Sequence, residues 1–167
     1  MCCVHPESSA EPTAQPRWLT AKEQRAWRAY MDGSQRLADY LSRDLQANHD
    51  MSLAEYRILV LLSESADSSL RMSDLADGVL SSRSRLTHQI RRMEAQGMVE
   101  RSNCVDDGRG VLANLTPEGR RRLEEAAPTH VESVRRNFVD LADAAQLSAV
   151  AEVFEKVDAT ISRTESE

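Results

Sequence analysis

The stretch from residue 79 to residue 101 constrains the fold more than any other part of this chain. Leu86, Ile90 and Met93 recur four and then three residues apart, which places them on one side of an α-helix. The opposite side carries hydroxyl, imidazole and guanidinium groups without an acidic residue. Such a face is either an ordinary solvated surface or the base-reading face of a DNA recognition helix. The candidate recognition residues are Ser81, Ser82, Arg83, Ser84, Arg85, Thr87, His88, Arg91 and Arg92.

Both ends of this helix are marked in the sequence, and a shorter helix is predicted before it. Ser81 or Ser82 can cap its start by accepting backbone N–H bonds, and Gly97 stands where a left-handed residue ends a helix. Upstream, Ser73 is predicted to cap a short helix that ends near Gly78. A short helix, a glycine-containing turn and a basic helix form a helix-turn-helix, which favours the recognition-helix interpretation.

The distribution of charge supports the same interpretation, although the 167-residue chain has a net charge of -6. Residues 81–122 hold nine arginines and five acidic residues, so the rest of the chain is strongly acidic. An acidic body keeps a protein soluble and concentrates positive potential on one surface. The charge pattern therefore favours a double-stranded nucleic acid partner at the basic segment.

Other features exclude several classes of protein. The length fits one domain, and no run of about 18 apolar residues or secretory signal is present, so a cytoplasmic protein without a membrane partner is expected. The four histidines have no metal-ligand spacing, and nucleophile and phosphate-loop motifs are lacking. We therefore expect no enzyme activity, no metal and no cofactor. Cys2, Cys3 and Cys104 are predicted to be reduced thiols.

A β-hairpin is predicted after the basic helix. Residues 98–101 and 111–115 have strand composition, and the segment between them is rich in turn-forming residues. Arg109 stands between two glycines at the tip, where it could enter the narrow minor groove, and Asp107 could hold its guanidinium. The hairpin is therefore predicted to be a wing whose DNA-binding residues are Asp107 and Arg109.

Long helices are predicted on both sides of this lobe, and residues 1–17 are predicted to be a disordered tail. A capping box of Thr20 and Glu23 begins a helix that extends to about residue 47, and a second box begins at Ser52. Thr116 is predicted to cap a helix that Pro128 kinks or restarts. A capping box of Asp143 and Gln146 begins a last helix. This helix carries an apolar stripe, namely Leu147, Val150, Phe154, Val157 and Ile161. These stripes are predicted to be buried against a second copy of the chain.

The predicted fold is mainly α with a minor β component: a winged helix-turn-helix with long N- and C-terminal dimerisation helices. Over residues 20–162 the chain resembles the MarR family of bacterial regulators. The resemblance is carried by the recognition segment 82–88, Glu94 with Gly97-Met98-Val99 and Arg101, residues 107–110 at the wing tip, and Leu115-Thr116-Pro117 with Gly119. It implies a single MarR-like domain over 18–167, with a DNA-binding lobe at about 50–118 and dimerisation helices at about 20–47 and 117–162.

The resemblance also implies a homodimer on a pseudo-palindromic operator, with a ligand cleft between the dimerisation helices and the DNA-binding lobe. The working hypothesis is a repressor released by a small effector, for which an aromatic acid would suit the available side chains. The candidate effector-binding residues are Trp27, Tyr30, His49 and His130. Two alternatives stay open: a cysteine-based redox sensor, and a protein-binding winged helix without DNA recognition. For the first, Cys104 lies on the wing but has no adjacent activating cation in the sequence.

Overall fold

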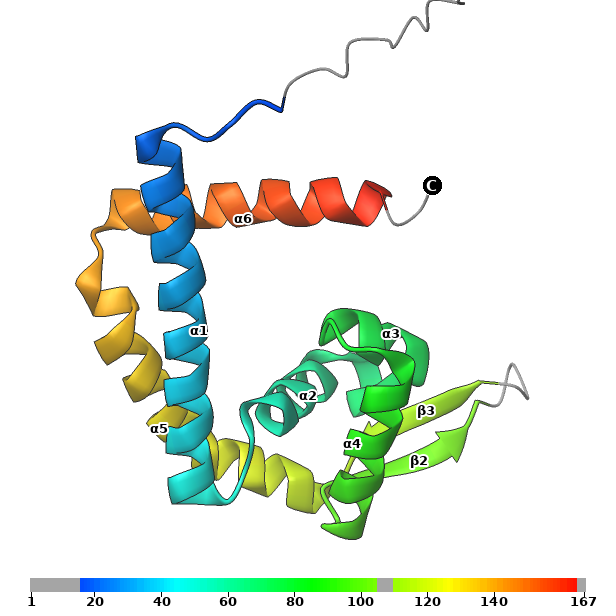
Figure 1. Cartoon of the computed structure of the whole chain (residues 1–167). Helices are drawn as coiled ribbons and strands as arrows, with labels where there is room; N and C mark the ends of the chain where they lie inside the picture. The colour runs from blue at the N-terminus through cyan, green and yellow to red at the C-terminus, as the bar shows by residue number, and fades with distance from the viewer. Residues whose placement is uncertain (1–15, 105–109, 165–167) are drawn as a thin grey trace, which may run out of the picture. The chain divides into compact units, whose positions relative to one another are not determined.

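A computed structural model of the chain describes residues 16–104 and 110–164. Within these ranges it contains six α-helices, two short 3-10 helices and three strands (Figure 1). The order is α1 (Ala21–His49), α2 (Leu53–Glu64), η1 (Ala66–Ser68), β1 (Ser69–Arg71), α3 (Met72–Gly78), α4 (Arg83–Ala95), β2 (Val99–Asn103), β3 (Val111–Leu115), α5 (Pro117–Asn137), η2 (Val139–Leu141) and α6 (Ala144–Thr164). The chain forms two compact units, Met1–Ser34 and Gln35–Glu167.

The first unit contains the start of α1, and the predicted capping box is confirmed there. The Thr20 backbone N–H donates to the Glu23 carboxylate at 2.7 Å, and the Glu23 backbone N–H donates to the Thr20 hydroxyl at 3.3 Å. These hydrogen bonds lower the pKa of Glu23. One turn further on, the rings of Trp27 and Tyr30 lie 5.9 Å apart. The unit is thus a locally stabilised helix start with an aromatic pair.

The second unit contains the hydrophobic core, which the end of α1, α2, α3, α4, the sheet and α5 build together. Its fully buried large side chains are Leu45, Met51, Ile58, Leu59, Leu62, Leu75, Leu86, Ile90, Met93 and Met98. The predicted capping box at Ser52 and Glu55 is present, so α2 begins where the sequence indicates. Burial of these side chains fixes α4 on the body of the lobe.

The sheet contains one strand that the sequence pattern did not predict. Its strand order is β1-β3-β2, with both pairings antiparallel, and Leu70 of β1 lies opposite Ala113 of β3. A strand of three residues, Ser69–Arg71, is too short to show a period in the sequence. Residues 69–71 are extended because they form backbone hydrogen bonds with β3. Ser73 does not cap α3, since Arg71 holds the N-cap position and the Ser73 hydroxyl donates to Asp74.

The helices after the hairpin follow the prediction with one correction. Thr116 caps α5, because its hydroxyl oxygen accepts the Gly119 backbone N–H at 3.0 Å. Of the two outcomes predicted at Pro128, a kink or a restart, the restart does not occur: α5 is continuous to Asn137, and its ribbon bends along its length (Figure 1). Pro128 is exposed, so the helix loses one hydrogen bond on its solvent side without ending. The predicted capping box of Asp143 and Gln146 is present before α6.

Candidate nucleic-acid interface

Helix α4 has the two-sided character that its sequence predicts. Leu86, Ile90 and Met93 are at most 1% exposed, so the apolar side is fully packed. The hydroxyl oxygen of Ser82 accepts the Arg85 backbone N–H at 3.3 Å, which makes Ser82 rather than Ser81 the capping residue. Gly97 follows the helix with a φ of 71°, the left-handed conformation predicted for it. The opposite side of α4 is consequently held outward on a rigid element.

The outward side of α4 presents nearly all the predicted recognition residues to solvent. Ser82, Arg83, Ser84, Arg85, His88, Arg91 and Arg92 are exposed, and Ser81 and Thr87 are half-buried. The Thr87 hydroxyl donates to the Arg83 carbonyl at 2.8 Å. Within the described ranges, the guanidinium groups of Arg83, Arg85 and Arg91 have no hydrogen-bond or ion-pair partner. The first turn of α4 contains no acidic residue, so the positive end of the helix dipole adds to these charges.

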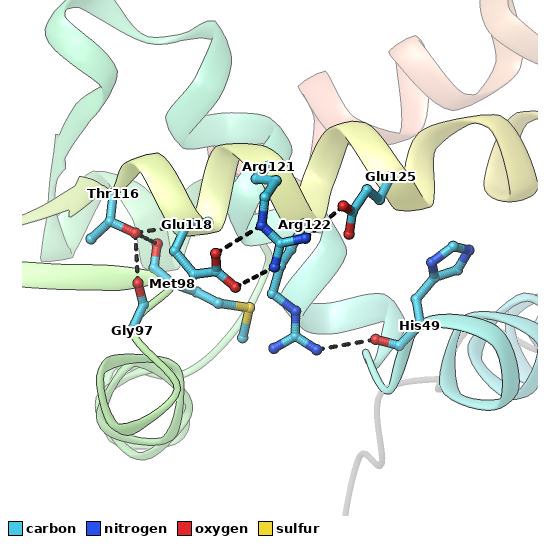
Figure 2. A network of polar contacts seen from close by, with 9 residues as sticks. His49, Gly97, Met98, Thr116, Glu118, Arg121, Arg122 and Glu125 are labelled. Atoms are coloured by element: carbon cyan, nitrogen blue, oxygen red, sulfur yellow. Dashed lines mark hydrogen bonds and ion pairs between the residues drawn. The ribbon is translucent and has the colours of Figure 1, made fainter.

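The arginines at the start of α5 differ from those of α4, because protein groups hold them (Figure 2). Arg121 forms ion pairs with Glu118 and Glu125, and this contact lowers the pKa of Glu118. Arg122 donates to the His49 carbonyl at 3.2 Å, and Arg120 donates to Ser68 at 2.7 Å. The charge count over residues 81–122 therefore overstates the free positive charge at this end. Among the described arginines of this segment, those with unpaired guanidinium groups lie on α4.

A buried carboxylate fixes the inner edge of α4. Glu55, 2% exposed, accepts a hydrogen bond from the Gln89 amide at 2.8 Å and lies 3.8 Å from the Arg92 guanidinium. It also accepts from the backbone N–H and the hydroxyl of Ser52, each at 2.8 Å. Glu55, which completes the capping box of α2, therefore also connects α4 to the core. Arg92 is partly engaged by protein, in contrast to Arg91.

The junction of wing and α5 is held by very close packing. The Thr116 hydroxyl lies 2.6 Å from the Gly97 carbonyl and 3.0 Å from the Met98 carbonyl (Figure 2). A Cβ atom placed on Gly119 would lie 2.0 Å from the Met98 carbonyl oxygen, so only glycine fits. The wing strands therefore leave the body in a fixed direction beside α4.

The wing is a hairpin of β2 and β3, as predicted. The Cys104 backbone N–H donates to the Gly110 carbonyl at 2.8 Å, which closes the described part of the hairpin. Asp107 and Arg109, the predicted wing contacts, lie outside the described residues. Cys104 does have a cationic neighbour, contrary to expectation: a nitrogen of the Arg71 guanidinium lies 3.5 Å from its sulfur. Arg71 comes from β1, 33 residues away, so the sequence offered no sign of the contact.

Two of the predicted effector residues, His49 and His130, belong to one polar cluster of the second unit, together with Thr129 and Tyr56. His49 and Thr129 are hydrogen-bonded at 2.8 Å, and the rings of His130 and Tyr56 lie 4.3 Å apart. Among the described residues, the Nδ1 atom of His130 is buried without a hydrogen-bond partner. Burial lowers the pKa of His130, and nearby Asp44 opposes that shift; burial also raises the pKa of Tyr56. Trp27 and Tyr30 pair with each other in the first unit.

Four residues with a part in this architecture were not among the predicted site residues. Glu55 was noted as a helix cap, and its contact with α4 depends on the tertiary fold. Arg71 and Gly119 likewise act through distant segments. Leu80, in the turn before α4, has a φ of 52° and is 80% exposed. Composition alone gives no sign of that conformation.

A short helix, a turn, an exposed arginine-bearing helix and a β-hairpin define a winged helix-turn-helix DNA-binding protein. Comparison with known proteins gives the family. Residues 51–111 match the model of the MarR family. AbsC, a MarR family transcriptional regulator from Streptomyces coelicolor, is 42% identical with a TM-score of 0.83, and the match covers 87% of this chain and 98% of AbsC. The chain belongs to the MarR family of transcriptional regulators.

Two further relatives agree with this assignment. Sco3205, a MarR family regulator of Streptomyces coelicolor solved in complex with DNA, is 41% identical with a TM-score of 0.83, covering 87% of this chain and 91% of that one. The HTH-type transcriptional repressor YetL of Bacillus subtilis (strain 168) is 26% identical over 114 residues, which are 66% of this chain and 68% of YetL. These relatives are regulators and not enzymes. No helix in the described ranges is both long and apolar enough to cross a membrane.

Proposed function

We propose that this regulator is a homodimeric, sequence-specific repressor that binds a pseudo-palindromic operator in double-stranded DNA. The observation that carries the proposal is the outward side of α4, where Arg83, Arg85 and Arg91 are exposed and their guanidinium groups have no protein partner within the described ranges. Arginine at such positions reads guanine or neutralises phosphate, and the short side chains of Ser84 and His88 allow close approach to base edges. A relative solved with DNA and a relative named as a repressor support the proposal.

The homodimer is supported by the apolar stripe of α6. Val150, Phe154, Val157 and Ile161 are 38 to 52% exposed in the single chain, and α6 has no buried residue. A helix with such a stripe needs a cover, and a second copy supplies one through a two-fold interface. The dimer would hold two recognition helices about 34 Å apart, at successive major grooves. Asp107 and Arg109 stay the proposed contacts of the wing.

Release by a small effector is supported by the polar cluster around His130. Its buried Nδ1 atom has no partner among the described residues, and the Tyr56 ring packs beside the imidazole in an aromatic environment. An aromatic acid fits this combination, because its ring can stack and its polar groups can bond an imidazole nitrogen. His49 and His130 are the proposed effector residues in this cluster, and Trp27 and Tyr30 remain predicted ones.

The test is selection of bound fragments from random duplex DNA at two salt concentrations. We expect a palindromic consensus with half-sites one helical turn apart. If about eight phosphates are neutralised per dimer, log affinity falls with log salt at a slope of about -7. Recovery of no duplex, or affinity that ignores salt, would instead favour a protein-binding winged helix without DNA recognition.

A further inference from the structure

Leu80 is an exposed apolar residue with an unfavourable backbone conformation. Its φ of 52° is left-handed, a conformation that costs a leucine free energy and that glycine or asparagine adopts more easily. Its side chain is also 80% exposed, whereas the neighbouring Val79 packs against the core. The left-handed residue ends α3, since the Leu80 and Ser81 N–H groups donate to the Asp77 and Ala76 carbonyls. The fold therefore explains the conformation, but not the choice of an exposed leucine for it.

The backbone holds this side chain in one place. The Leu80 N–H donates to the Asp77 carbonyl at 3.1 Å, and the flanking N–H groups of Val79 and Ser81 donate into α3 at 3.0 and 2.9 Å. The turn is therefore ordered on both sides of Leu80. Its side chain is presented from a rigid element, as a contact residue for a specific partner should be.

The surroundings of Leu80 are those of the proposed DNA interface. Leu80 stands two residues before Ser82, the cap of α4, and lines one surface hollow together with Arg57, Ser81 and Arg85. In a helix-turn-helix, the residues at the start of the recognition helix contact base edges. In the major groove the apolar group on a base edge is the C5-methyl of thymine.

We propose that Leu80 reads a thymine methyl group in each half-site and thereby helps determine operator specificity. The inference rests on the proposed DNA-binding function. The arginines beside it supply affinity through phosphate or guanine, and Leu80 adds discrimination at one T·A pair by removing apolar surface from water. The left-handed turn that ends α3 leaves this side chain exposed at the start of α4.

The experiment replaces single thymines of the selected operator with deoxyuridine, which removes only the C5-methyl. We expect one thymine per half-site at which uracil weakens binding of the full-length protein about three- to fivefold, as measured by fluorescence anisotropy at fixed salt. Leu80→Ala should weaken binding to the thymine operator by a similar factor and be insensitive to uracil there. Uracil at thymines outside the bound site serves as the control DNA.

Leu80→Asn separates this role from a role in folding. Asparagine tolerates the left-handed conformation, so this variant should unfold at the same or a higher temperature while binding the operator more weakly. The inference is overturned if uracil has no effect at any thymine, if Leu80→Ala keeps the sensitivity to uracil, or if the bound site contains no thymine. Failure to bind any duplex would overturn the proposed function itself, and the inference with it.

Discussion

The amide of Gln89 donates to the buried carboxylate of Glu55 across 2.8 Å, which joins the first turn of α2 to the recognition helix. The same carboxylate caps α2 through Ser52, so one side chain serves two elements. A mutation at Glu55 therefore affects the helix start and the seating of α4 together.

Replacing Glu55 with alanine should lower the free energy of unfolding by about 2 to 3 kcal/mol, because a cap is lost and Gln89 is left inside without its acceptor. Glu55→Gln, which keeps hydrogen-bonding groups at this position, should cost about half as much. Urea denaturation followed by circular dichroism gives both values. Glu64→Ala, an exposed change at the end of the same helix, should stay within about 0.5 kcal/mol of the wild type. Equal effects of Glu55→Ala and Glu64→Ala would contradict the assignment.

Gly119→Ala should be severely destabilising, by about 3 kcal/mol or more, since the added Cβ would meet the Met98 carbonyl oxygen at 2.0 Å. Gly33→Ala is the matched control, because a Cβ at that helical position meets no atom within 4 Å. That change should stabilise the protein by about 0.4 to 1 kcal/mol. Thermal unfolding of both variants measures the two effects, and the prediction is wrong if their signs agree.

Arg91→Ala should weaken operator binding and make it less dependent on salt. Each protomer loses one phosphate contact, so the slope of log affinity against log salt should become shallower by about two for a dimer. Arg121→Ala removes an arginine held by Glu118 and Glu125 and should leave the slope unchanged. Anisotropy titrations at four salt concentrations test the pair. Identical slopes for both variants would argue against α4 as the contact surface.

The stability of the protein should fall as the pH falls through the ordinary pKa of histidine, about 6.5. Burial lowers the pKa of His130, so the unfolded chain binds a proton more readily than the folded one. The stabilising contribution of neutral His130 is complete above that value and is lost below it. Urea midpoints at pH 7.5 and 5.5 should differ less for His130→Asn than for the wild type. An unchanged difference would mean that another group is responsible.

Phe154→Glu should convert the dimer into a monomer, because a charge within the α6 stripe cannot be covered by an apolar partner face. Glu152→Gln, on the opposite side of the same helix, should leave the association unchanged. Sedimentation velocity at several protein concentrations distinguishes the two states. A wild type that sediments as a monomer would contradict the proposed assembly.

Local signals predicted most of the helical fold. The capping pairs Thr20–Glu23, Ser52–Glu55 and Asp143–Gln146 involve residues three apart, so the sequence displays both partners together. Strand β1 was missed because its order comes from pairing with β3, more than forty residues away. Local patterns carry no information about such distant partners.

The candidate site was likewise predictable only where local sequence patterns determine it. The two-sided pattern of α4 identified its buried stripe and its exposed arginines, since helical periodicity determines both. Which arginines stay free was not predictable, because Arg120 and Arg122 find partners in Ser68 and the His49 carbonyl. The strain at Leu80 is a backbone property, and the side chain's identity does not reveal it.

The hydrogen bond from Arg122 to the His49 carbonyl joins two points 73 residues apart, just outside the ends of the DNA-binding lobe. This contact holds the two ends of the intervening segment together. Engineers who transplant the lobe into another regulator should therefore cut the chain before His49 and after Arg122. A graft trimmed between these two residues would lose both the Arg122 guanidinium and the His49 carbonyl that accepts its hydrogen bond, so this contact would no longer hold the two ends of the graft together.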